Sequence, residues 1–112
     1  MLFRSHPAVL AALAHIVKAA HAQDKTVSIC GELAGDPRAA PLLVAMGFDQ
    51  LSMNAGSLSV IKRVLGTFST ADLAALTSSL LSMRSAQEVA ATLDAALSQR
   101  GLEAFLRRGG AA

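Results

Sequence analysis

The chain is poor in the residues that mark disulfide-bonded and metal-binding proteins. It has one cysteine, no tryptophan, no tyrosine and only 16% charged residues, with a formal net charge of +2. A single cysteine excludes an internal disulfide and favours a reducing, cytoplasmic setting. The three histidines do not cluster at metal-ligand spacing, because nine and six residues separate His6, His15 and His21. We therefore expect no metal ligands in this chain.

Long apolar runs and basic stripes are also missing. Charged residues interrupt every apolar segment before it reaches the roughly 18 to 20 residues of a membrane span. The interrupting residues near the N-terminus are Lys18, Asp24, Glu32 and Asp36. The only basic pairs are residues 62–63 and 107–108, which do not form a stripe. We therefore expect neither a membrane nor a nucleic acid as a partner.

What the chain has in abundance is small and aliphatic apolar residues. Hydrophobic residues make up 53% of its 112 residues, although aromatics make up only 4%. This length suits one domain with a core of its own. Ordinary soluble domains carry about 25% charged residues, so this composition leaves too little charge for a normal surface. The excess apolar surface implies a covering partner, either another subunit or the rest of a larger domain.

Helical and strand-like patterns alternate over residues 7–66. We expect parallel strands joined by a right-handed crossover, because short loops connect the alternating segments. The apolar, β-branched stretch "TVSIC" is typical of a strand buried on both faces. The expected elements are a helix from Pro7 (capped by Ser5 or His6) to about residue 21, a strand at 26–30, a helix from Asp36-Pro37 to Gly47, a strand at 48–54, and a helix from Ser57 to Gly66.

Beyond Gly66 the pattern is purely helical. One helix should start at Ser69 or Thr70, another at the capping box of residues 85–88, and a short one should cover 102–108. Two parallel strands do not make a stable sheet by themselves. We therefore expect a piece of a larger α/β sheet over residues 1–66 and a helical tail over 67–112, as in a chain cut from a longer protein.

Two loops follow the expected strands, where ligands gather in α/β folds. They hold Cys30-Gly31-Glu32 and Met53-Asn54-Ala55-Gly56. Cys30 has no histidine near it in sequence to activate it as a nucleophile. With a thiol pKa of about 8.5 it would be mostly protonated at pH 7, which suits a donor of a proton to a carbanion-like carbon. The alternative role is that of a small buried hydrophobic residue.

Other polar residues near these loops have two interpretations each. Glu32 and Asp36 are either metal carboxylates or, respectively, a solvated turn acid and a helix N-cap. Arg38 is an anion-binding or salt-bridging residue, or simply a surface residue. Asn54 caps the next helix or lines a pocket. His15 and His21 suit a helix surface, and Met46, Met53 and Met83 suit packing.

At these residues the chain resembles a known family. Residues 28–65, "SICGELAGDPRAAPLLVAMGFDQLSMNAGSLSVIKRVL", are similar to the end of the phosphoenolpyruvate (PEP)-binding barrel of the PEP–protein phosphotransferases, the enzyme I family. The segment "LFRSHPAVLAALAHIVKAAH", "LSMNA" and the ending "RGLEAFLRRGG" resemble its nitrogen-branch paralogue. Pyruvate phosphate dikinase and PEP synthase share the Cys-Gly pair but diverge after it. Two alternatives remain: a fragment of such an enzyme, or a non-catalytic helical dimerisation module.

The resemblance implies a (β/α)8 TIM barrel of which this chain supplies the last two βα units, with the preceding helix. It implies that Cys30 donates the proton to the enolate carbon when PEP becomes pyruvate. The phosphoryl group would pass to a protein histidine and then to a histidine-containing phosphocarrier protein. Residues 67–112 would pack on the barrel or on the partner in a homodimer.

The same resemblance implies that most of the machinery lies outside this chain. The complete enzymes of the family use Mg²⁺, but Glu32 and Asp36 do not match the magnesium ligands. None of the three histidines sits in the phosphohistidine context, and the substrate-clamping arginines lie upstream. We therefore expect Cys30 to be the only active-site residue here, and the isolated chain to be inactive.

Overall fold

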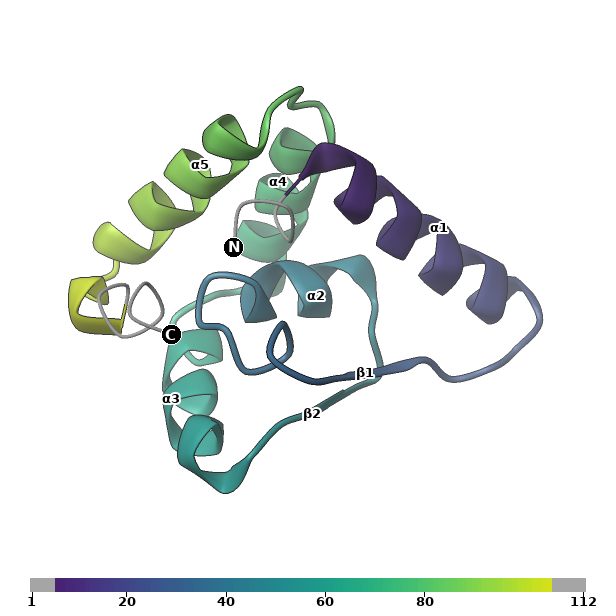
Figure 1. Cartoon of the computed structure of the whole chain (residues 1–112), viewed down its shortest axis with the longest axis horizontal. Coiled ribbons are helices and arrows are strands. Elements are labelled where there is room, and N and C mark those ends of the chain that lie inside the picture. Colours follow the sequence, from purple (N-terminus) through teal and green to yellow (C-terminus); the bar gives the residue numbers. More distant parts are fainter. Residues whose placement is uncertain (1–5, 106–112) are drawn as a thin grey trace.

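Seven regular elements follow one another in the computed structural model, which describes residues 6–105 (Figure 1). Helices and strands alternate in the first half, and only helices follow, so the chain is an α/β protein in which helices dominate. The elements are α1 (Pro7–Ala22), β1 (Ser28–Cys30), α2 (Ala40–Met46), β2 (Gln50–Ser52), α3 (Ala55–Leu65), α4 (Thr70–Leu81) and α5 (Ala86–Ser98).

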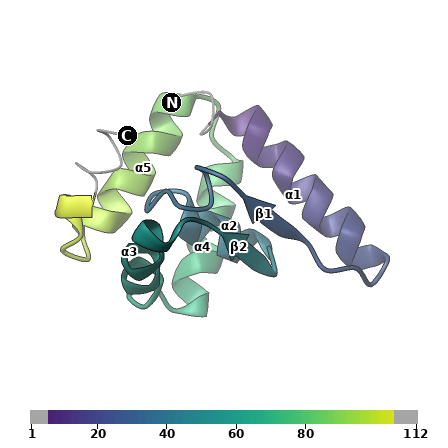
Figure 2. The same ribbon diagram turned by 60° about the horizontal axis from the view of Figure 1, so that its bottom comes forward.

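The two strands form a parallel pair, as the alternation predicts. Ile29 lies opposite Leu51, and Cys30 lies opposite Ser52. Helix α2 makes the crossover between them and lies behind the strands in Figure 2. Ile29 and Leu51 pack with a buried cluster formed by Val17, Ala39, Leu43 and Phe48.

Within this chain the first strand is covered on one face only, not on both faces as predicted. The neighbours of Ile29 in β1, Ser28 and Cys30, are exposed, as are Gln50 and Ser52 in β2. Successive side chains in a strand point to opposite faces, so the helices cover one face and leave the other open. Each strand is also only three residues long, shorter than the stretches 26–30 and 48–54 that were expected.

Capping side chains set most helix starts. Ring atom Nδ1 of His6 accepts a hydrogen bond from the N–H of Ala8 and begins α1, one of the two expected caps. Ser69 caps α4 in a reciprocal capping box with Asp72. Ser85 accepts from the N–H of Glu88 at the start of α5. These side chains satisfy N–H groups that have no partner within the helix.

Two helices start elsewhere than predicted. Helix α2 begins at Ala40 rather than beside Pro37, because residues 37–39 form a turn in which the N–H groups of Ala39 and Ala40 both bond to the carbonyl of Asp36. Helix α3 begins at Ala55 rather than Ser57, because Asn54 caps it. Of the short helix expected at 102–108, residues 103–105 are helical. Residues 106–108 lie outside the described residues.

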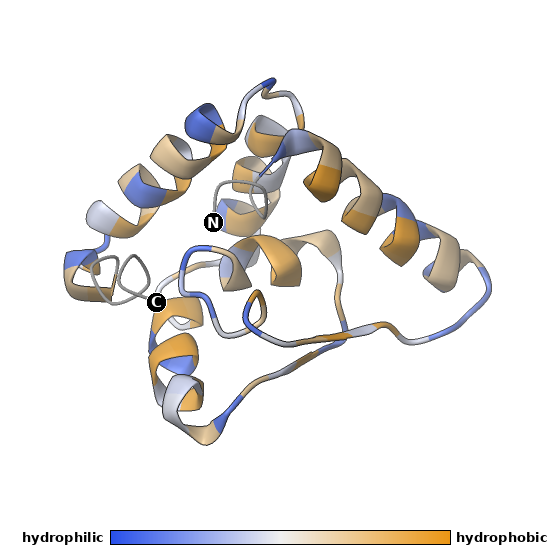
Figure 3. Ribbon diagram, in the orientation of Figure 1, coloured by the Kyte–Doolittle hydropathy of each residue, from blue (hydrophilic) through white to orange (hydrophobic). Residues whose placement is uncertain are grey.

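Buried residues from both halves of the chain form shared cores. One cluster joins Leu10 and Leu42 to the tail residues Leu80, Val89 and Leu93. Another joins Val64 to Leu97 and Leu102. Helix α2, at the centre of these contacts, is almost wholly apolar (Figure 3). The helical tail therefore packs directly on the strand-bearing half.

No single helix in the described part of the chain is both long and apolar enough to cross a membrane. Helices α3 and α4 reach the required length and composition only as a pair, and that pair is bent by 100°.

Candidate functional site

Cys30 is the last residue of β1, at the carboxyl end of the parallel pair, where the sequence predicted it. Its thiol is free and exposed. Within this chain Cys30 is therefore not buried, as the alternative role would require. Because β2 runs parallel and ends at Ser52 beside Cys30, the segments that follow both strands begin at the same edge of the sheet. We call residues 31–39 the donor loop, because they follow Cys30, the proton donor that the sequence led us to expect.

The donor loop packs against the start of α3. A Cβ atom placed on Gly35 would lie 3.2 Å from the Oγ of Ser57 and 3.5 Å from the Cβ of Met53, so a larger residue would crowd this contact. Gly31, directly after Cys30, has a φ of +95°, in the region that glycine adopts without strain. The chain can therefore turn sharply after Cys30 and bring the loop against the residues that follow β2.

Two of the polar candidates serve the backbone. Asp36 Oδ1 accepts a hydrogen bond of 2.9 Å from the N–H of Arg38, so Asp36 caps the turn that leads into α2. Asn54 Oδ1 accepts one of 2.9 Å from the N–H of Ser57 and caps α3. Glu32 is exposed within the loop. Over residues 6–105, no three His, Cys, Asp or Glu side chains gather as a metal site would require.

Arg38 makes the salt bridge that was one of its expected roles. Its Nη1 lies 3.5 Å from Oδ1 of Asp94, on α5. The two side chains are 24% and 44% exposed. Sequence reasoning named Arg38 but not its partner, because no local pattern links residues 56 positions apart (94 − 38). The donor loop thus contacts α3 on one side and α5 on the other.

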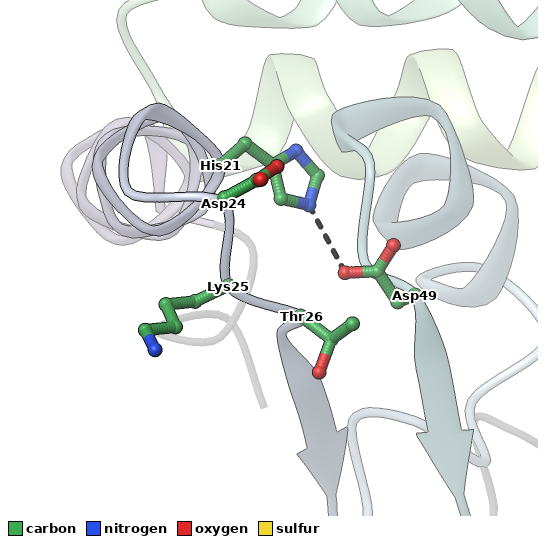
Figure 4. Close-up of a pocket in the computed structure, with 5 residues that line it drawn as sticks. All are labelled: His21, Asp24, Lys25, Thr26 and Asp49. Atoms are coloured by element: carbon green, nitrogen blue, oxygen red, sulfur yellow. Dashed lines mark hydrogen bonds and ion pairs between the residues drawn. The ribbon is translucent and has the colours of Figure 1, made fainter.

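A polar pocket lies at the opposite edge of the sheet, at the amino ends of the strands (Figure 4). It has a volume of about 220 Å³ and is lined by His21, Asp24, Lys25, Thr26 and Asp49. Asp49 Oδ2 lies 3.0 Å from Nε2 of His21 and accepts a 2.7 Å hydrogen bond from the N–H of Val27. The hydrogen bond with His21 has the larger effect and that with Val27 the smaller, and together they hold the pKa of Asp49 below its usual value.

His21 is exposed, as expected for a helix surface, but its contact with Asp49 was not predicted. The pocket lies away from Cys30, because the residues that line it precede the strands. The His21–Asp49 contact joins the end of α1 to the segment just before β2.

Comparison with known proteins identifies the strand-bearing half of the chain. The family described as "PEP-utilising enzyme, PEP-binding domain" matches residues 2–70, which include Cys30 and both strands. Curated relatives carry the name phosphoenolpyruvate-protein phosphotransferase. A Bacillus sp. relative is 39% identical over 84 residues, and one from Haemophilus influenzae is also 39% identical over 84 residues. One from Streptococcus equinus is 44% identical over 66 residues.

These alignments cover most of this chain but little of each relative. The Bacillus and Haemophilus matches cover 75% of this chain and 14% and 15% of the relative, respectively. The Streptococcus match covers 59% of this chain and 11% of the relative. The family match covers more than half of the chain and includes the whole β1–α2–β2 unit. This chain therefore belongs to the PEP-utilising enzymes and corresponds to part of their PEP-binding domain.

Proposed function

We propose that the chain is the C-terminal segment of a PEP–protein phosphotransferase and that Cys30 is its proton donor. The observation that carries this proposal is an exposed thiol at the carboxyl end of a parallel strand, within the part of the chain that matches the PEP-binding domain. The names of the curated relatives favour this activity over that of a dikinase or synthase.

The open face of the sheet supports its placement in a (β/α)8 barrel, with β1 and β2 as the last two strands. In such a barrel the helices surround the strands and the other strand face points to the interior. Here the helices cover the face that carries Ile29 and Leu51, and Cys30 lies on the other face. Residues 1–66 would form the end of the barrel, and residues 67–112 would pack on it or on the partner of a homodimer.

The proposed chemistry of Cys30 is a single proton transfer. When PEP loses its phosphoryl group, the remaining enolate needs a proton at C3 to become pyruvate. The S–H bond of Cys30 would break, its proton would form the new C–H bond, and the thiolate would regain a proton from solvent.

The phosphoryl group would pass to a protein histidine and then to a histidine-containing phosphocarrier protein. The family is consistent with Mg²⁺, but the described residues offer no group of three ligands for it. We place the metal, the phosphate-binding residues and the phosphoacceptor histidine outside this segment, and the working enzyme in the cytoplasm. A lone proton donor provides no charge neutralisation for phosphoryl transfer, so the segment alone should be inactive.

Cys30→Ala in the complete enzyme tests the proposal. Turnover of PEP to pyruvate should fall by about 10² to 10⁴, the usual contribution of a positioned general acid. Magnesium and substrate affinity should change little, because other residues bind them. Cys30→Ser should be almost as impaired, because an alcohol is a much weaker acid than a thiol.

Stereochemistry provides the sharper measurement. PEP labelled at C3 and turned over in deuterated solvent should give pyruvate protonated on one face by the wild type. With the donor removed, water would protonate both faces. A Cys30→Ala enzyme that keeps the wild-type rate and single-face protonation would remove Cys30 from the mechanism.

A further inference from the structure

We propose that Arg38 and Asp94 form a positioning pair through which α5 holds the donor loop, and with it Cys30, in place. The structural part of this inference depends only on contacts within the chain. Its catalytic consequence rests on the proposed function of Cys30.

The contact between Arg38 and Asp94 is partly enclosed. Nη1 of Arg38 lies 3.5 Å from Oδ1 of Asp94. Within the described residues, Arg38 Nε and Asp94 Oδ1 are buried and have no hydrogen-bond partner. A buried oxygen without such a partner depends on the nearby opposite charge for compensation. Removing either side chain would therefore leave the other poorly compensated, which makes the two residues interdependent.

Asp94 lies in α5, and residues of α5 on either side of Asp94 are packed against other elements. Leu93, its neighbour, is buried with Leu42 of α2 and Val89 of α5. Leu97, on the other side of Asp94 in α5, is buried with Val64 and Leu102. These contacts make α5 a firm support from which Asp94 can hold a loop.

The donor loop rests on the core through Ala34 and Ala39, which are buried, and it contacts α5 through the side chain of Arg38. Gly31 begins it with a positive φ, and Gly35 rests against Ser57. Arg38 is held at its backbone by Asp36 and at its side chain by Asp94. The side-chain contact is thus the loop's attachment to α5. Losing it would loosen the segment between Cys30 and α2, although the core beneath α2 would remain.

Hydrogen exchange in the complete enzyme tests this coupling directly. Arg38→Gln and Asp94→Asn should each raise the exchange rate of the amides in residues 31–39 by about threefold or more, as expected for loss of a partly enclosed ion pair. Arg100→Gln is the matched control, because it breaks another ion pair of the same tail, with Asp72 at 3.3 Å. It should leave residues 31–39 unchanged.

A charge reversal and a kinetic measurement separate positioning from general stability. The double variant Arg38→Asp with Asp94→Arg should bring loop exchange back towards the wild type. The single variants should lower kcat about threefold to tenfold. They should leave the KM for PEP unchanged, because the loop places the proton donor and not the substrate.

Unchanged exchange in residues 31–39, an equal effect of Arg100→Gln, or a failed charge reversal would overturn the coupling. Loosened exchange with an unchanged kcat would overturn the positioning role. These outcomes differ from failure of the proposed function, which would appear as full turnover in Cys30→Ala.

Discussion

At the scale of single residues, Gly31 controls the direction of the chain directly after Cys30. Its φ is +95°, and no atom beyond Gly31 and its two chain neighbours lies within 4 Å of the place where a Cβ would be. Gly31→Ala should therefore act through backbone strain alone and lower the free energy of unfolding by about 1–2 kcal/mol. Denaturant unfolding of the complete protein measures the change.

Gly56→Ala is the matched control for this substitution. Gly56 lies in α3 without a positive φ, and its added Cβ would lie 3.4 Å from Asn54 Oδ1. Alanine is the better helix former, so this variant should be neutral or slightly more stable than the wild type. Equal losses in both variants would contradict strain at Gly31.

Asp49 gives the chain a predicted sensitivity to acid. Its hydrogen bonds with His21 and Val27 lower its folded pKa below the reference value of 3.8. A lowered pKa means that the folded state favours the carboxylate. The resulting stability is present above pH 3.8 and is lost as the pH falls through the folded pKa.

Asp49→Asn should therefore be less stable than the wild type at pH 7, and the difference should shrink below about pH 4. Urea midpoints at pH 7, 5 and 3 measure this trend. Asp24→Asn makes the same charge change in the same pocket and serves as the control. A difference for Asp49→Asn that stays constant with pH would refute the expected role of its charge.

At the scale of elements, the parts of the fold that depend on local signals were predictable. The caps at His6, Ser69 and Ser85 and the stop at Gly66 were recognisable from the sequence, because each acts on neighbouring backbone groups. The placement of Cys30 at a strand end was also predictable from a local signal, because the apolar, β-branched stretch that ends at Cys30 favours a strand.

What the sequence did not reveal depends on distant partners. The open strand face follows from which helices cover the sheet. The contacts Arg38–Asp94 and His21–Asp49 join residues on separate elements. No spacing rule predicts such pairs. The start of α2 was missed because a turn that begins at Asp36 has the same residue types as a helix cap.

Leu93 tests whether the tail helix belongs to the core. It is 3% exposed and lies in the cluster that contains Leu10 and Leu42. Leu93→Ala should lower the free energy of unfolding by about 2–5 kcal/mol, the usual cost of such a cavity. Leu81→Ala, at a residue 44% exposed, should cost much less. Equal effects in thermal unfolding would mean that α5 does not pack on the strand-bearing half.

At the scale of the whole molecule, the radius of gyration is 13.1 Å, close to the roughly 13 Å of a compact domain of this length. Within residues 6–105 the sheet nevertheless has only two strands, each with an open outer edge. Unpaired edges invite pairing with another chain. We therefore expect the 112-residue chain, expressed alone, to self-associate or to pack loosely.

Light scattering and thermal unfolding check this expectation together. Self-association would give a mass well above that of one chain, and loose packing would broaden the melting transition. A monomer of 11.5 kDa with a sharp cooperative transition would contradict the prediction.

The sole cysteine also makes the chain a natural reporter of its own assembly. Cys30 is exposed on the uncovered face of the sheet, so a fluorophore attached to its sulfur needs no engineered labelling position. If a separately expressed upstream fragment completes a barrel around this face, the dye would move from water into an enclosed interior. Its emission would shift as the two fragments combine, and a titration would give the affinity with which a divided enzyme reassembles.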